Sequence, residues 1–182
     1  QVESGWQPKS AAPEPETSGP KQRTVSAYAD LLSIPAMEKV MMEAMQEAEK
    51  PEYTEEDYAY AAQFAADENS PSIDTDILPA DQTINLGSTD VGDVSWQVPT
   101  GLIGVATEAT GCALHTWQIV AQGKSPLAHK GMHYAARILF AAAKKLYESP
   151  ERCALIQDDY QNVIGHRTYQ SMLPDSVKPG DF

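Results

Sequence analysis

The order of segments from residue 86 onward constrains the fold of this chain most. A polar, glycine-containing loop, Leu86 to Trp96, leads to a short apolar segment, Gly101 to Ala106. A short apolar run bounded by turn residues is typical of a buried strand. A long amphipathic helix is then predicted from Ser125, because a serine followed by a proline is a favourable helix start. This order predicts an α/β fold with polar loops at the strand ends.

Further helices are predicted around these strands. Between residues 26 and 48 apolar side chains recur at three- and four-residue spacing, and Pro35 places the regular start of that helix. Thr54 precedes three acidic residues, a pattern that caps free amides and favours the positive end of a helix. A shorter helix is predicted over about 151–163. With a second strand at Thr83–Leu86, we expect a short mixed sheet flanked by helices.

The helix predicted from Ser125 has one apolar face that we expect to lie in the core. Its members are Met132, Ala135, Ala136, Leu139, Ala143 and Leu146. His129 and His133 stand four residues apart on this helix, which is the spacing of a helical zinc pair. The zinc motif needs a glutamate where this chain has Lys130. We therefore expect His129 to be partly buried beside the core.

Four methionines form a soft apolar stripe on the first predicted helix. They are Met37, Met41, Met42 and Met45. Methionine is flexible and fills irregular gaps, so the stripe suits either core packing or a groove that binds a partner. Core packing is the commoner outcome for such a stripe.

The N-terminal region differs in composition from the rest. Residues 1–24 contain four prolines and almost nothing apolar, which predicts a disordered tail or linker. Residues 25–182 form the predicted folded part. The first residue is Gln1 rather than methionine, so we expect that the chain is processed, trimmed or cut from something longer. It contains neither a signal-peptide pattern nor an apolar stretch long enough to span a bilayer.

Charge and cysteine content narrow the partners and the compartment. Thirteen Lys and Arg residues against 26 Asp and Glu residues give a net charge of -13. This balance argues against nucleic acid or an anionic membrane as the main partner, because both reward clustered cations. Two cysteines are too few for a disulfide scaffold at this length, which favours the cytoplasm.

His115 is the first candidate for chemistry. It follows a predicted strand and a glycine-containing loop, among residues that do not continue a helix. A neutral imidazole can bind zinc or manganese and can also act as a general base. A single histidine at such a place is more often structural or merely exposed, so spacing alone leaves both interpretations open.

The loop that precedes the apolar segment offers further polar groups. Asp90 and Asp93 stand around a glycine, where carboxylates can orient a ligating histidine or cap their own loop. Ser88 and Thr89 supply hydroxyls, and Gly87 lets backbone amides approach an anionic group. No Gly-Lys-Ser/Thr follows, so the loop is not a nucleotide-binding P-loop.

Cys112 stands close to His115 in sequence, which raises the possibility of a thiol nucleophile with a histidine base. The sequence shows no third residue that would orient the pair.

Four segments together resemble the metal-dependent amidohydrolases of the aminoacylase and carboxypeptidase superfamily. They are the run Gly87 to Trp96, the segment Leu114 to Gln118, and the segments Val120 to Lys124 and Ala128 to Met132. Within that superfamily they look most like the aminobenzoyl-glutamate utilisation protein B type, and the resemblance covers roughly residues 30–180. The run Gly87 to Trp96 is the specific signature, whereas the short histidine motif alone is weak.

The resemblance implies a parent with two divalent metal ions, zinc or manganese, and a smaller domain that mediates dimerisation. It implies that His115 supplies the last metal ligand and that Gly87, Ser88, Thr89, Asp90 and Asp93 lie on the substrate side of the site. The remaining ligands and the glutamate base are implied to precede the matched region, and no candidate for them stands before residue 80. No catalytic residue is therefore assigned within this chain.

The sequence thus predicts the C-terminal part of an amidohydrolase catalytic domain. It would hydrolyse the amide of an N-acyl amino acid such as p-aminobenzoyl-glutamate, with the site completed by other polypeptide in a homo- or heterodimer. We expect the isolated chain to be inactive. The alternative is a non-catalytic interaction module or truncated paralogue that binds a partner through its methionine-rich helix.

Overall fold

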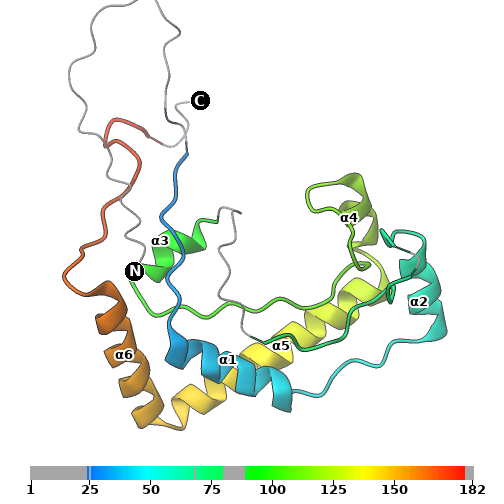
Figure 1. The fold of residues 1–182 in the computed structure, drawn as a ribbon, viewed down its shortest axis with the longest axis horizontal. Coiled ribbons are helices and arrows are strands. Elements are labelled where there is room, and N and C mark those ends of the chain that lie inside the picture. The colour runs from blue at the N-terminus through cyan, green and yellow to red at the C-terminus, as the bar shows by residue number, and fades with distance from the viewer. Residues whose placement is uncertain (1–23, 25, 68, 80–88, 179–182) are drawn as a thin grey trace, which may run out of the picture. The chain divides into compact units, whose positions relative to one another are not determined.

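The computed structural model describes residues 24, 26–67, 69–79 and 89–178, which form helices joined by extended segments (Figure 1). The helices in this part of the chain are α1 (Pro35–Glu47), α2 (Glu55–Ala62), α3 (Val91–Ser95), α4 (Trp117–Gln122), α5 (Pro126–Tyr147) and α6 (Pro150–Ile164). The chain divides into two compact units, residues 28–172 and the two ends, 1–27 with 173–182. All of these helices belong to the first unit. The described part of the second unit contains a turn in which the Val177 amide donates to the Pro174 carbonyl over 2.9 Å.

The predicted α/β fold is wrong for the described residues, which contain helices and no strand. Gly101–Ala106, predicted as a buried strand, is extended but pairs with no other described segment. Its apolar side chains still find a core, because Ile103 and Val105 pack against the helices. The predicted strand Thr83–Leu86 and the predicted tail, residues 1–24 apart from Thr24, lie outside the described residues.

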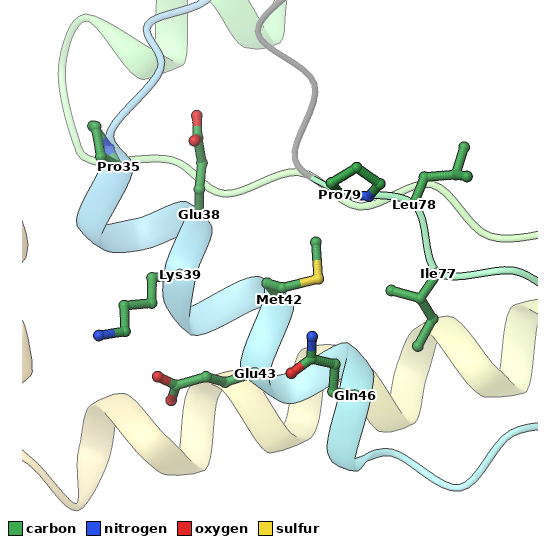
Figure 2. A pocket seen from close by; sticks show the side chains of 9 residues that line it. All are labelled: Pro35, Glu38, Lys39, Met42, Glu43, Gln46, Ile77, Leu78 and Pro79. Carbon is green, nitrogen blue, oxygen red and sulfur yellow. The ribbon is translucent and has the colours of Figure 1, made fainter.

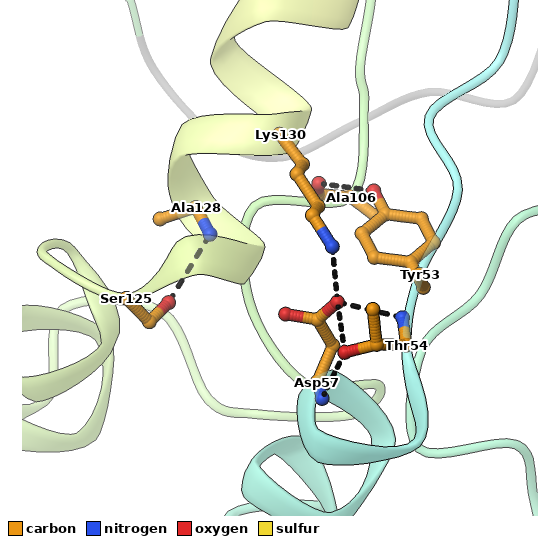
Figure 3. Close-up of polar contacts among 7 residues, drawn as sticks. All are labelled: Tyr53, Thr54, Asp57, Ala106, Ser125, Ala128 and Lys130. Atoms are coloured by element: carbon orange, nitrogen blue, oxygen red, sulfur yellow. Dashed lines mark hydrogen bonds and ion pairs between the residues drawn. The ribbon is translucent and has the colours of Figure 1, made fainter.

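The helix starts follow the local signals in the sequence. α1 begins at Pro35, as predicted, with the proline in its first turn. Thr54 and Asp57 form a reciprocal capping box at the start of α2. At α5 the Ser125 hydroxyl accepts the Ala128 amide over 3.1 Å (Figure 3). α6 begins one residue before its predicted start, where the Ser149 hydroxyl caps the first turn.

The main core lies between α1, α5 and α6. Figure 1 shows α1 against α5, and α6 following α5 after a sharp turn. The buried side chains of this core are Leu32, Ile34, Val40, Met41, Ala44, Tyr134, Ile138, Ala142, Ile156 and Tyr160. Glu43 of α1 joins the three helices, since it lies 2.7 Å from Arg152 and 3.8 Å from Lys145. The hydrogen bond from Arg152 lowers the Glu43 pKa, although burial opposes it, and both cations add to the lowering.

The face of α5 that is buried differs from the predicted one. The helix buries Leu127, Ala128, Gly131, Tyr134, Ile138 and Ala142. The predicted core positions Met132, Ala136, Leu139 and Ala143 are exposed, and His129 is exposed as well. Apolar residues cover most of the circumference of this helix, so periodicity could not select the face that meets α1. The correction leaves a second apolar face of α5 uncovered by described residues.

A smaller core connects α2 to the start of α5. Its buried members are Ala61, Ile73, Ala109 and Leu127. Beside it Lys130 of α5 makes an ion pair with Asp57 of α2 (Figure 3). Asp57 is 4% exposed and Lys130 is 30% exposed, so the pair is largely shielded from solvent. This ion pair therefore helps to hold α2 against α5, because few apolar contacts join the two helices there.

Among the described residues, no helix combines the length and apolar character that crossing a bilayer requires.

Candidate functional site

The described part of the signature run, residues 89–96, contains the short helix α3, and its polar side chains hold an extended segment of the chain. The Asp93 carboxylate accepts the backbone amide of Ala29 over 2.8 Å. The Ser95 hydroxyl is fully buried, accepts the Leu32 amide over 3.0 Å and donates to the Gly92 carbonyl over 2.6 Å. An extended segment beside a helix has no ladder to satisfy its amides, so these side chains do so.

Two further residues of the run complete this contact. The Trp96 indole donates to the Asp30 carbonyl over 2.9 Å. Gly92 is buried, and a Cβ placed on it would lie 1.9 Å from the Ala29 carbonyl oxygen. Only glycine lets the two backbones approach so closely. The signature therefore specifies a structural junction between α3 and residues 29–32.

The chain after α6 also packs on α3. The Arg167 guanidinium lies 4.8 Å from the Trp96 ring centre. Burial raises the pKa of Tyr169, and the neighbouring Asp93 carboxylate raises it further. Asp93 thus serves at least two structural partners.

The other residues of the predicted substrate loop have fewer contacts. Thr89 and Asp90 are exposed, and the Thr89 hydroxyl accepts the Val91 amide over 3.3 Å. The Asp90 side chain does not cap α3. Gly87 and Ser88 lie outside the described residues. The substrate-facing role of this loop stays a prediction.

His115 lies on an exposed loop immediately before α4. Its φ of 60° is in the left-handed region, which residues other than glycine and asparagine rarely adopt. The next residue, Thr116, donates its hydroxyl to the Ala113 carbonyl over 2.8 Å and so closes the turn. The imidazole therefore stands at the surface on a constrained turn.

Gln122 holds the loop that precedes His115. Its side chain is completely buried. Its Oε1 accepts the Ala109 amide over 2.8 Å, while its Nε2 donates to the Gln118 carbonyl and lies 3.5 Å from the Cys112 sulfur. The sequence analysis did not find this residue, because a lone glutamine on a short helix has no distinguishing pattern.

Aromatic contacts connect α4, which follows the His115 loop, to α2 and the residue Phe64 just after it. The Phe64 and Trp117 ring centres are 6.4 Å apart, and those of Phe64 and Tyr60 are 5.3 Å apart. The Tyr60 hydroxyl also donates to the Ala121 carbonyl over 3.2 Å. α4 is thereby attached to α2, and through the Asp57–Lys130 pair to α5.

The structure does not bring the predicted site residues together. Asp93 lies beside residue 29 and Tyr169, whereas His115 precedes α4, whose Trp117 contacts Phe64 just after α2. Within the described ranges no group of three or more His, Cys, Asp or Glu side chains is placed to hold a metal ion. His115 alone offers one donor, so these residues do not form a metal site by themselves. No hydrogen bond joins Cys112 to His115 among the described residues, so the thiol mechanism gains no support.

Two adjoining cavities flank α1. The first, about 700 Å³, lies between α1 and the segment that reaches Pro79 (Figure 2). Figure 2 shows Met42 pointing from α1 towards Ile77. The second, about 720 Å³, shares these two residues and continues along Gly101–Ala106 to Cys112. His115 lines neither cavity.

The chain is similar to the B subunit of the p-aminobenzoyl-glutamate hydrolase of Escherichia coli (strain K12), with 29% identity over 172 residues. The match covers 79% of this chain and 36% of the relative, so the chain spans about a third of that protein's length. No family model matches the chain. No solved structure matches it either. This similarity supports the resemblance to the aminobenzoyl-glutamate utilisation protein B type that the sequence motifs indicated.

Proposed function

We propose that this chain is one part of a metal-dependent amidohydrolase that cleaves an N-acyl amino acid such as p-aminobenzoyl-glutamate. The observation that carries the proposal is the similarity to the p-aminobenzoyl-glutamate hydrolase relative over most of this chain. Because the chain spans about a third of that relative, the rest of the site belongs to other polypeptide, either joined to this chain or separate.

In this proposal His115 supplies one ligand to a centre of two zinc or manganese ions. When bound, such ions polarise the amide carbonyl and lower the pKa of a water. The exposure of the imidazole and its constrained turn support the assignment, since a ligand must be accessible and held in position. Gln122 would hold the preceding loop in position, and the loop from Gly87 to Asp90 would face the substrate.

The test uses the assembly that contains this chain in its source cell, purified through a tag on the chain. We expect it to release p-aminobenzoate from p-aminobenzoyl-glutamate and to contain bound metal. His115→Asn should abolish release and lower the metal content without changing the melting temperature, because asparagine accepts the left-handed turn. His129→Asn, at another exposed histidine, is the matched control and should retain activity. An assembly with bound metal and no hydrolysis, or full activity in His115→Asn, would overturn the proposal.

The second candidate is a non-catalytic interaction module. The cavity lined by Met41, Met42 and Met45 favours it, since methionine-rich surfaces adapt to protein partners. An assembly that lacks metal and leaves the amide intact, yet requires this chain to form, would support this candidate.

A further inference from the structure

Residues 101–105 have the backbone of a strand without a partner. The segment is extended, and none of its amide or carbonyl groups hydrogen-bonds another described residue. At the next position, the Ala106 carbonyl accepts the Tyr53 hydroxyl over 3.5 Å (Figure 3). Backbone groups of a partly buried segment are almost always paired in complete structures. The backbone groups of this segment are therefore free to bond water or the backbone of another strand.

The side chains of this segment alternate as in a strand that is covered on one face. Ile103 and Val105 pack inward against the main core. Leu102 is 53% exposed, and Gly104 is exposed, with nothing within 4 Å of the position that a Cβ would take. Such a period of two is the geometry of a β-strand with one free face. The helices thus hold the segment in the conformation that pairing requires.

An apolar groove runs beside the segment. Its volume is about 720 Å³, and its lining includes Met41, Met42 and Met45 from α1. Ile77 and Leu78 line it as well. The flexible methionines can adjust to the side chains of a strand laid along them. A small molecule would satisfy one or two backbone groups of the segment, whereas a strand would satisfy those on one edge along the whole segment.

Charges at the groove further specify the occupant. Among the described residues that line it, Lys50 is the one cation, and four side chains are acidic: Glu38, Asp74, Asp76 and Glu108. A strand with Lys or Arg at its ends would match this excess of negative charge. The apolar floor requires that alternate side chains of that strand be apolar.

We propose that residues 101–106 pair with a β-strand of the polypeptide that corresponds to the unmatched part of the p-aminobenzoyl-glutamate hydrolase relative, and that this strand lies in the methionine-lined groove. This chain matches about a third of that relative, and we infer that the strand comes from polypeptide corresponding to the remainder. The inference rests on the proposed function only for the identity of this occupant. The unbonded backbone of residues 101–105, the groove beside it and the acidic side chains of that groove all favour a strand, whether or not the assembly hydrolyses an amide.

The test compares hydrogen exchange in the tagged assembly and in the purified chain alone. We expect the amides of residues 102–106 to exchange freely in the isolated chain, and alternate amides among them to exchange at least about tenfold more slowly in the assembly, because one added strand pairs with one edge of the segment. Cross-linking mass spectrometry should place a segment of the companion polypeptide beside Leu102. Continued fast exchange at residues 102–106 in the assembly would overturn the inference. Pairing with a second copy of this chain would overturn the choice of occupant.

Two variants at one position sharpen this test. Gly104→Pro removes an amide that bonds nothing in the described structure, so the isolated chain should keep its melting temperature while the assembly is lost. Gly104→Ala keeps the amide and places its methyl group in open space, so the assembly should survive. Equal assembly by both variants would contradict the pairing. Protection without p-aminobenzoate release would reject the proposed function alone, and release without protection would reject this inference alone.

Discussion

The backbone carbonyl of Ala29 occupies the space in which a side chain on Gly92 would begin. The two segments are joined further by the Asp93 carboxylate, which accepts the Ala29 amide 2.8 Å away. The contact connects segments more than sixty positions apart in the sequence, and it explains why a glycine stands inside a helix as short as α3.

Gly92→Ala should disrupt this contact. The added Cβ would lie 1.9 Å from a backbone oxygen that cannot move without displacing residues 28–32. We expect the free energy of unfolding to fall by about 1 to 3 kcal/mol, the usual range for overpacking. Denaturant unfolding measures this, with Gly104→Ala as the control at an open position. An unchanged unfolding midpoint would show that the segment separates from α3 without cost.

The pair formed by Asp57 and Lys130 should make stability depend on acid. Burial opposes ionisation of Asp57, but hydrogen bonds from Lys130 and Thr54 and the Lys130 charge outweigh it, so its pKa is lowered. A lowered pKa stabilises the fold fully above the unfolded pKa, about 4, and this contribution is lost as the pH falls through the lower folded pKa. Asp57→Asn should destabilise the chain at pH 7 by on the order of 3 kcal/mol.

The difference between wild type and Asp57→Asn isolates this pair from other acids. It should be constant from pH 5 to pH 7, shown by urea unfolding across about that range, and should shrink below about pH 4. A difference that grew on acidification would reverse the assigned sign. Glu43, whose pKa is also lowered, remains in both proteins and cancels in the comparison.

Gln122→Leu should loosen the loop before His115. The substitution keeps side-chain volume but leaves the buried Ala109 amide without its acceptor, at a cost of about 1 to 3 kcal/mol. Hydrogen exchange at Ala109 and Cys112 should accelerate more than exchange in α6. Gln118→Leu, which keeps the backbone carbonyl that Gln122 uses, is the control. Uniform acceleration across both regions would show that Gln122 affects global stability alone.

The left-handed backbone at His115 can be tested by stability measurements alone, independently of any catalytic role of the side chain. With φ at 60°, His115→Gly should stabilise the fold by up to about 1 kcal/mol, and His115→Val should destabilise it by at least as much. Thermal unfolding of the wild type and the two variants measures the order of their stabilities. If valine were tolerated as well as glycine, the left-handed turn would not be maintained in solution.

The sequence predicts those parts of the fold that depend on neighbouring residues. Pro35, Thr54 and Ser125 each carry their own helix-start chemistry, and each helix begins there. The sheet was predicted wrongly, because an apolar run such as Gly101–Ala106 favours an extended chain without supplying a second strand, and this segment pairs with no described residue. α3 was missed since its stability comes from residues 29–32, far away in sequence.

In the candidate site, too, the sequence predicts what depends on neighbouring residues and misses what depends on distant contacts. A polar, glycine-rich run suggested substrate contacts, yet Asp93 and Ser95 bind backbone amides of the same chain. The exposure of His115 agrees with a ligand, but its left-handed backbone and its support by Gln122 depend on three-dimensional contacts that spacing does not encode. Ligation by His115 stays a prediction.

The exposed apolar side chains of α5 should affect how the chain behaves in concentrated solution. Leu139, Phe140 and Tyr147 face outward there, and Phe140 is 71% exposed. Such a strip promotes colloidal clustering as concentration rises, which the strong negative charge of the chain counteracts at low salt. Light scattering should therefore report larger particles when sodium chloride screens that repulsion, and lysine at positions 139 and 140 should keep concentrated samples clear.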